Sequence, residues 1–413
     1  MSEYRPARVW FTAPAMQSMQ TTHRYDTCFR HGTTAPRAVV HAVLHAVARA
    51  VRFALVVLGW GPVLAAVAAV AHAGGVPVPV SSTAAVQAPY TLRIVGGLAA
   101  VNQYTRQEEP FWTRDLARLS GGKFSAEIVP FDRAGVPGSE MLRLLQLGVV
   151  PFGTALMSSF TAQYPEYTAP DLAGLNPDIA TLKTTLAAFR PYLEKTLRDQ
   201  HGVEVLAVYV YPAQVVFCKN PMRSLADLSG RRVRVSSATQ ADFVAALGGV
   251  PVLIGFAQIT PSLATGNIEC VVTGTMSGNT MGLHALTTHV HAMPLTWGLA
   301  VFGANRAAWD ALPPELRALL RRELPRLEAA IWQESERETA DGMACNRGAP
   351  TCTAGRKGRM VVVPVSAQDE RRRHEILTTV VLPRWVQRCG SRCTQVWNQT
   401  IGPVRGVVAP PLK

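Results

Sequence analysis

The sequence has few charged and few aromatic side chains, and it lacks any concentrated block of charge. Of its 413 residues, 17% are charged, 7% are aromatic and 48% are hydrophobic. This composition fits a globular chain with a large core and excludes an intrinsically disordered one. The net charge is +13, but no run of five or more like charges and no alternation of basic with aromatic residues occurs. The positive charge therefore does not indicate a nucleic-acid partner.

The motifs of common active sites are also missing. The sequence contains no G-x-S-x-G, no G-x-x-x-x-G-K-S/T, no H-E-x-x-H and no complete G-x-G-x-x-G. Its histidines do not fall at metal-ligand spacings, and Cys218 has no neighbouring base that could make it a nucleophile. We therefore predict a protein that is not an enzyme and that holds no cofactor.

Only one long apolar run is present, and it lies near the N-terminus. Arg49 and Arg52 precede the run Phe53–Val70, and small residues follow up to Ala73. This pattern predicts a signal peptide cleaved after Ala73 and an exported mature protein. The run is about 18 residues long, near the minimum for a membrane anchor. Glycine and proline interrupt it, which favours the signal peptide over the anchor.

Cysteine is scarce, with seven residues in the chain, and four of them lie close to the C-terminus. In an exported protein these four predict two disulfides, with three possible pairings, in preference to a zinc site, which usually uses C-x-x-C pairs. The four are Cys345, Cys352, Cys389 and Cys393. Cys218 and Cys270 lie in apolar, strand-like runs, and we expect them to be buried thiols.

Strand and helix patterns alternate from Tyr90 onward. Strands are expected at Tyr90–Val95, Phe124–Val129 and Val149–Leu156, and helices at Gln103–Leu119 and Ser139–Leu147. A β-α-β-α-β opening implies a parallel sheet with right-handed crossovers.

A strand near Glu204–Tyr211 should lead into a second α/β domain, and Pro313–Thr339 repeats leucines at helical spacing. We predict an α/β fold with two domains and one long helix bracing both domains. The expected organisation is a leader at 1–73, a linker at 74–89, domain I at 90–212 completed by about 297–325, domain II at 213–296 completed by about 326–344, and a Cys-containing extension at 345–413.

The stretch Ser224–Gly249 carries the clearest functional signal. Arg232–Ser236 alternates as a strand does, and a helix at Thr239–Leu247 follows at once. Arg234 thus lies where a strand gives way to a helix N-terminus, a place where open α/β sheets bind ligands. Its planar guanidinium can bond both oxygens of a carboxylate, although a structural ion pair would suit the position equally well.

Four ordered segments give the chain a family resemblance. They are Ser120–Pro130, Gly138–Glu140 with Leu144–Gly148, Leu225–Val235 and Leu263–Glu269. From about Tyr90 to Trp332 the chain resembles the solute-binding proteins of TRAP transporters, the DctP-like family. The resemblance implies the periplasmic-binding-protein-like α/β fold, with mixed sheets and hinge strands between its two domains. It also implies a periplasmic receptor whose two domains close on a small organic acid, which is then passed to membrane permease subunits for ion-driven uptake.

The resemblance also assigns candidate ligand-binding residues. Arg234 matches the family's carboxylate-binding arginine, whereas Gln214 replaces a second arginine found in many members and Thr273 replaces an asparagine found in several. One arginine in place of two favours a monocarboxylate or an acid with a neutral tail. Gly274, beside Thr273 after an expected strand at Ile268–Val272, could line the same cleft.

Three further candidates come from other parts of the chain. Ser158 should face the cleft from the first domain, and Gln103 starts the first helix. Trp297 either stacks on the ligand or packs in the core. Two alternatives remain: an exported enzyme in which Arg234 anchors the substrate and His289 is the general base, or a ligand sensor without a transport role.

Overall fold

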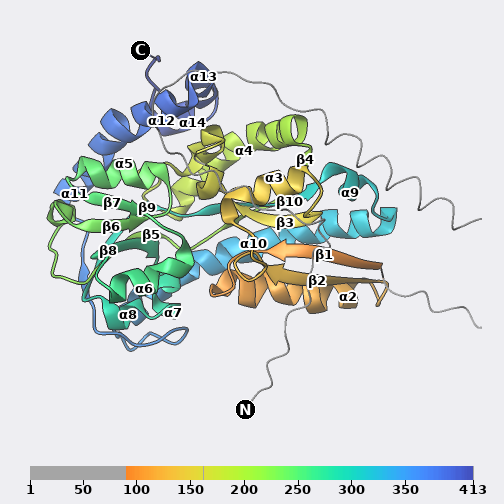
Figure 1. Ribbon diagram of the computed structural model, residues 1–413, viewed down its shortest axis with the longest axis horizontal. Coiled ribbons are helices and arrows are strands. Elements are labelled where there is room, and N and C mark those ends of the chain that lie inside the picture. The colour runs from red at the N-terminus through yellow and green to blue at the C-terminus, as the bar shows by residue number, and fades with distance from the viewer. Residues whose placement is uncertain (1–89, 161, 413) are drawn as a thin grey trace, which may run out of the picture. The chain divides into compact units, whose positions relative to one another are not determined.

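The computed structural model describes residues 90–160 and 162–412, and these residues form two mixed β-sheets with helices packed around them (Figure 1). The first sheet has the strand order β2-β1-β3-β10-β4, and the second has the order β11-β9-β5-β8-β6-β7. The predicted α/β fold with mixed sheets is therefore confirmed. The expected leader and linker lie outside the described residues.

The first sheet begins with the expected parallel strands, since β1 pairs in parallel with both β2 and β3. Strand β10 then pairs antiparallel with β3 and β4, which makes the sheet mixed. Its strands are β1 (Tyr90–Gly96), β2 (Phe124–Pro130), β3 (Phe152–Leu156), β4 (Val203–Val210) and β10 (Leu299–Asn305). The intervening helical stretches are Gln103–Glu108, Phe111–Asp115, α2 (Leu116–Leu119), Gly138–Glu140, α3 (Met141–Gln146) and α4 (Ile179–His201).

The second sheet is also mixed, with antiparallel pairs at its centre and parallel pairs on both sides of them. Strand β6 runs parallel to β7 and β8, whereas β5 pairs antiparallel with β8 and β9. Its strands are β5 (Gln214–Cys218), β6 (Arg232–Val235), β7 (Val250–Leu253), β8 (Cys270–Gly274), β9 (His289–Thr296) and β11 (Val361–Val363). The helices are α5 (Ala238–Ala246), α6 (Ile259–Ala264), α7 (Thr275–Thr280) and α8 (Leu283–Leu286).

Strand β8 starts and ends two residues later than expected. Thr273 and Gly274 therefore belong to the strand, and the small residues after them form α7 in place of a loop. The reason is close packing against the long helix α10: a β-carbon at Gly342 of α10 would collide with the main chain of Thr275 and Met276. Small side chains at this contact allow a helix where composition alone suggests a loop.

Helix α10 (Pro314–Asn346) is the expected long helix, and it continues past its expected end at Thr339. Its 33 residues correspond to about 50 Å at 1.5 Å per residue. It packs against β4 of the first sheet and α7 beside the second sheet, and Figure 1 shows it running across both. The Trp332 indole N–H donates to the Val208 carbonyl at 2.8 Å, which fixes the helix to β4.

The C-terminal residues add strand β11 to the edge of the second sheet and then form a group of helices near α4 (Figure 1). These helices are α11 (Ala367–Ile376), Leu377–Val381, α12 (Leu382–Cys389), α13 (Ser391–Gln399) and α14 (Ile401–Arg405). The short helix α9 (Arg306–Asp310) does not belong to this group and precedes α10 in the chain. Two disulfides are present here, as expected, and the pairing is Cys345 with Cys352 and Cys389 with Cys393.

The expectation for Cys218 and Cys270 was wrong in one respect. Both are buried, as predicted, but they form a disulfide instead of remaining free thiols. The physical reason is the antiparallel pairing of β5 with β8, which places the two residues directly opposite each other. Because 52 residues separate the two cysteines along the chain, the sequence alone does not indicate that they are close in space.

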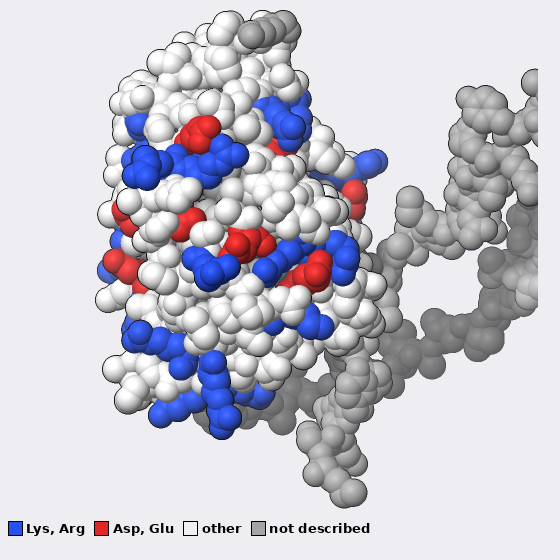
Figure 2. Space-filling view, turned by 90° about the vertical axis from the view of Figure 1, so that its left-hand side faces the viewer, with Lys and Arg blue, Asp and Glu red and all other residues white. Residues whose placement is uncertain are grey.

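The surface agrees with the dispersed charge read from the sequence. On the face shown in Figure 2, basic and acidic side chains are interspersed over most of the surface, with wide uncharged areas between them. Within residues 90–160 and 162–412, no helix combines the length and apolar character that a membrane span requires.

Candidate functional site

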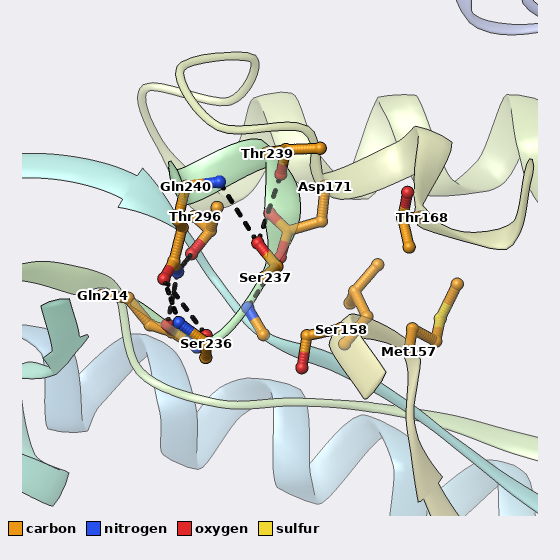
Figure 3. A pocket seen from close by; sticks show the side chains of 12 residues that line it. Met157, Ser158, Thr168, Asp171, Gln214, Ser236, Ser237, Thr239, Gln240 and Thr296 are labelled. Atoms are coloured by element: carbon orange, nitrogen blue, oxygen red, sulfur yellow. Dashed lines mark hydrogen bonds between the residues drawn. The ribbon is translucent and has the colours of Figure 1, made fainter. Parts of the chain in front are cut away.

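A small polar cavity lies where the end of β6, the start of β5 and the connection between β9 and β10 meet (Figure 3). The centre of a water molecule can reach only about 20 Å³ of it, which is room for about one water. Its walls carry hydroxyl, amide and carboxylate groups from both sheets and their connections. The lining residues are Met157, Ser158, Thr168, Asp171, Gln214, Ser236, Ser237, Thr239, Gln240, Thr296, Gly298 and Leu299.

One wall of the cavity is the N-terminus of α5. Ser237 is the N-cap: its backbone is extended, and its hydroxyl oxygen accepts a hydrogen bond from the N–H of Gln240 at 3.2 Å. The next residues of the chain, Thr239 and Gln240, also line the cavity. A helix N-terminus carries partial positive charge and unpaired N–H groups, so this wall favours an anion.

The side chain of Gln240 joins three segments around the cavity (Figure 3). Its Nε2 donates to Gln214 Oε1 at 2.9 Å and to Thr296 Oγ1 at 2.7 Å, and its Oε1 accepts from the N–H of Ser236 at 2.8 Å. Sequence reasoning missed Gln240, although Ser237 and Gln240 have the spacing of a capping box. Here the amide bonds the residue before the cap, which orders the β6–α5 turn.

Asp171 is the one charged side chain among the described residues that line the cavity. Its Oδ2 accepts from the N–H of Gly298 at 2.7 Å, and its Oδ1 accepts from the N–H of Trp297 at 3.0 Å. Burial raises the pKa of Asp171 to about 7, against the lowering effect of these two hydrogen bonds. No sequence motif marks this residue, and its position follows only from the fold.

Arg234 is buried, with 4% of its surface exposed, and it does not line the cavity. Its Nη1 donates to the Val272 carbonyl at 2.8 Å and its Nε to the Ile254 carbonyl at 3.1 Å. Among the described residues, no carboxylate lies within 4.0 Å of its guanidinium. Desolvation lowers the pKa of Arg234 to about 10. Arg234 is therefore a buried cation that lacks an acidic partner in the part of the chain that the structure describes.

Along the sequence, Arg234 is nevertheless only two residues away from Ser236, which lines the cavity. Residues two apart on a strand face the same side of the sheet, so Arg234 shares a face with Ser236, which lines the cavity just beyond the end of β6. Gln214 and Ser158 lie in the wall of the cavity, whereas Arg234 is its neighbour only along the chain.

The remaining predicted residues are buried outside this cavity. Thr273 lies opposite Val215, and Gly274 lies opposite Gln214, in the β5–β8 pairing. The indole of Trp297 donates to the Asn176 carbonyl at 3.1 Å and packs in the core, while its main-chain N–H reaches Asp171.

Gln103 is 2% exposed, and neither its amide nitrogen nor its amide oxygen has a hydrogen-bond partner among the described residues. A β-carbon placed on Gly97 would lie 3.6 Å from the Gln103 Nε2 and 3.2 Å from the Tyr211 hydroxyl. Gln103 therefore belongs to a buried polar region around the end of β1.

The same region holds a fully buried carboxyl group. Glu108 is 0% exposed, and its carboxylate accepts from the N–H of Gly97 at 2.9 Å and from the Thr154 hydroxyl. Burial raises the pKa of Glu108 to about 7, while the two hydrogen bonds lower it.

A catalytic arrangement around Arg234 finds no support in the geometry. His289 on β9 is separated from β6 by β5 and β8, a distance of about 14 Å at some 4.8 Å per strand. A general base must reach its substrate within hydrogen-bond distance. Within the part of the chain that the structure describes, no three His, Cys, Asp or Glu side chains gather closely enough to hold a metal ion.

Comparisons with known proteins agree with this fold. DctP7 of Bordetella pertussis, described as an extracytoplasmic solute receptor binding pyroglutamic acid, has a TM-score of 0.65 at 22% identity, over 75% of this chain and 98% of its own. A TRAP periplasmic solute binding protein from Desulfovibrio salexigens, with bound orotic acid, has a TM-score of 0.67 at 16% identity, over 77% of this chain and 99% of its own. At these identities the likeness establishes the fold.

A third solved structure, a TRAP periplasmic solute binding protein from Pseudomonas aeruginosa with bound L-malate, has a TM-score of 0.61 at 14% identity, over 70% of this chain and 97% of its own. The family model for DctP, bacterial extracellular solute-binding protein family 7, matches residues 96–344, which is more than half of the chain. The chain therefore belongs to family 7 of the bacterial extracellular solute-binding proteins, the DctP family.

Proposed function

We propose that this protein is an extracytoplasmic receptor that binds a small organic acid by closure of two domains and delivers it to a TRAP-type membrane permease for ion-driven uptake. The observation that carries the proposal is Arg234, a buried guanidinium without an acidic partner among the described residues. Burying an unpaired charge is costly. A ligand carboxylate would supply the missing negative charge and could form two parallel hydrogen bonds with the guanidinium.

The surroundings of Arg234 support an anionic ligand. The N-terminus of α5 forms one wall of the cavity, and its partial positive charge attracts an anion, as the charge of the arginine does. The relatives with solved structures include receptors with bound pyroglutamate, orotate and L-malate, all of which are organic acids.

Gln214 adds no charge to the cavity, and this limits the class of acid that the cavity suits. Gln214 lines the cavity where a second arginine would provide a second positive charge, and its amide is already engaged with Gln240. An acid with one carboxylate, or with an uncharged tail, fits this environment better than a dicarboxylate.

The size of the cavity supports a mechanism that includes opening. Room for about one water is far less than an organic acid needs, so the walls must separate before a ligand enters. Two strand connections, β4 to β5 and β9 to β10, pass from one sheet to the other beside the cavity, and α10 lies along both sheets (Figure 1). Bending at these connections would open the site and then close it around the ligand.

Membership of an extracellular family supports a location outside the cytoplasm and a membrane partner. We propose export by the signal peptide predicted to end at Ala73, and delivery of the ligand to the permease subunits of a TRAP transporter. Uptake of a radiolabelled ligand by cells carrying the permease genes, with and without this protein, tests that role. Ligand binding without any effect on uptake would favour the sensor alternative.

The binding function is tested with purified protein that begins at Gly74. We expect its melting temperature to rise with at least one acid of a panel of small organic acids, and Arg234→Ala to abolish the rise. The matched control is Arg232→Ala, on the same strand, which removes an exposed arginine paired with Glu269 at 3.4 Å. Tight binding by Arg234→Ala would show that the anchor lies elsewhere.

A further inference from the structure

Asp171 presents a strong hydrogen-bond acceptor to the cavity. A carboxylate has about four lone-pair positions, and the described contacts come from only two main-chain N–H groups: Trp297 at 3.0 and 3.1 Å, and Gly298 at 2.7 Å. No Lys, Arg or His of the described residues forms an ion pair with it. Asp171 can therefore accept a further hydrogen bond from a molecule in the cavity.

The side-chain amide of Gln240 cannot accept or donate a further hydrogen bond in this way. Both hydrogens of the Gln240 amide are donated, to Gln214 and Thr296, and its oxygen accepts from the N–H and the hydroxyl of Ser236. A donor group on a ligand would thus meet Asp171 as the strongest acceptor in the wall.

We propose that Asp171 is a specificity-determining residue that selects organic acids carrying, besides the carboxylate, an N–H or O–H donor directed at its side chain. The inference rests on the proposed function, because it concerns the same ligand. An acid whose second group only accepts hydrogen bonds would place two acceptors against each other and leave both without a donor. Burial also raises the pKa of Asp171, and a donor from the ligand would favour the ionised form.

The test uses pairs of acids that differ only in the donor. One pair is L-pyroglutamate and its γ-lactone counterpart, in which a ring oxygen replaces the N–H, and the other is L-malate and succinate, which lacks the hydroxyl. We expect calorimetry with the wild-type protein to show, for the pair that binds, about tenfold or more tighter binding of the member with the donor.

Asp171→Asn is expected to reduce this ratio of affinities, between the acid with the donor and the acid without it, to about threefold or less. The reason is that a neutral amide oxygen is the weaker acceptor. The matched control is Asp178→Asn, because Asp178 is exposed and also accepts a main-chain N–H, that of Thr181, at 2.7 Å. This control should leave the ratio unchanged. Mass spectrometry of the ligand retained by protein purified under native conditions should identify an acid with a donor, and this result does not depend on the folding of any variant.

Three outcomes would overturn the inference. An unchanged ratio in Asp171→Asn would show that the carboxylate does not contact the donor. An equal loss of affinity for both members of a pair would show that Asp171 only orders the main chain at Trp297 and Gly298. If no acid bound to the wild-type protein, the proposed function would fail as well, and this result is distinguishable because it does not involve the variant.

Discussion

Cys218 of β5 and Cys270 of β8 form a disulfide, with 4.1 Å between their Cα atoms. The loop that it closes contains Arg234 and the whole of α5, so the stretch with the candidate anchor and one wall of the cavity is covalently tied at both ends. The two cysteines lie on β5 and β8, which are the central strands of the second sheet.

We predict that this disulfide contributes more to stability than the shorter one at Cys345 and Cys352. In the chain-entropy treatment, closing a loop with a separation of 52 residues stabilises by about 4 kcal/mol and one of 7 residues by about 2 kcal/mol. Denaturant unfolding of Cys218→Ala with Cys270→Ala, compared with the matching double variant of the shorter pair, measures the difference. Alkylation of Cys218 in unreduced, unfolded protein would contradict the pairing.

Replacement of Arg234 by lysine should weaken acid binding while leaving the fold intact. Lysine keeps the charge but lacks the planar fork that forms two parallel hydrogen bonds, and it cannot reproduce both contacts to the Val272 and Ile254 carbonyls. We expect about a tenfold or greater loss of affinity by calorimetry. Arg232→Lys, on the exposed part of the strand, should bind as the wild type does. Equal affinities for both variants would argue against a bidentate contact.

Glu108 should make stability fall as the pH rises through the weakly acidic range. Its pKa is raised from 4.5 to about 7 in the folded protein, so between these values the folded state keeps a proton that the unfolded state has lost, and stability decreases with pH. The penalty is absent below about pH 4.5 and complete above about pH 7, reaching about 3 kcal/mol.

The variant Glu108→Gln resembles the protonated side chain and should remove this penalty. Its free energy of unfolding relative to the wild type should therefore increase from pH 4.5 to pH 7, as measured by denaturant titration across that range. Glu127→Gln, which changes an exposed residue of β2, is the control. A difference that stays constant with pH would mean that Glu108 titrates normally.

Gly298→Ala should impair binding beyond its effect on stability. Gly298 has φ of +76°, and an added β-carbon would collide with the side-chain amide of Gln214 in the cavity wall. Gly282, at φ of +88° with open space around it, provides a control with the same backbone strain. Both alanine variants should lose about 1–2 kcal/mol of stability, but only Gly298→Ala should bind acids more weakly. Equal binding by the two would place the ligand away from Gln214.

Local patterns in the sequence were sufficient for most elements of the fold. The strand with Arg234 and the helix that follows both lie within a residue or two of their expected positions, because their signals are near in the sequence. The observed bounds of strand β8 differ from the expected ones because the end of the strand depends on packing against α10, which is distant in the chain.

The site itself was less accessible to sequence reasoning. The family pattern named Gln214 and Ser158 as candidates, and both line the cavity. Their role in ligand binding stays a prediction. Asp171 and Gln240 were missed because their roles depend on contacts with Trp297, Gly298, Gln214 and Thr296, which come from other strands and connections. The pairing of Cys218 with Cys270 likewise depends on a strand register that no local signal encodes.

The small volume of the cavity has a practical consequence for crystallography. A lattice that holds the chain in this arrangement would leave an acid no room beside Asp171 and Gln214, because only about one water fits between the walls. Soaking such crystals with ligand should give empty sites at any concentration, or should crack the crystals as the walls move. The complex should therefore be crystallised from protein saturated with ligand beforehand, and X-ray scattering in solution should be used to compare the dimensions of the free and bound protein.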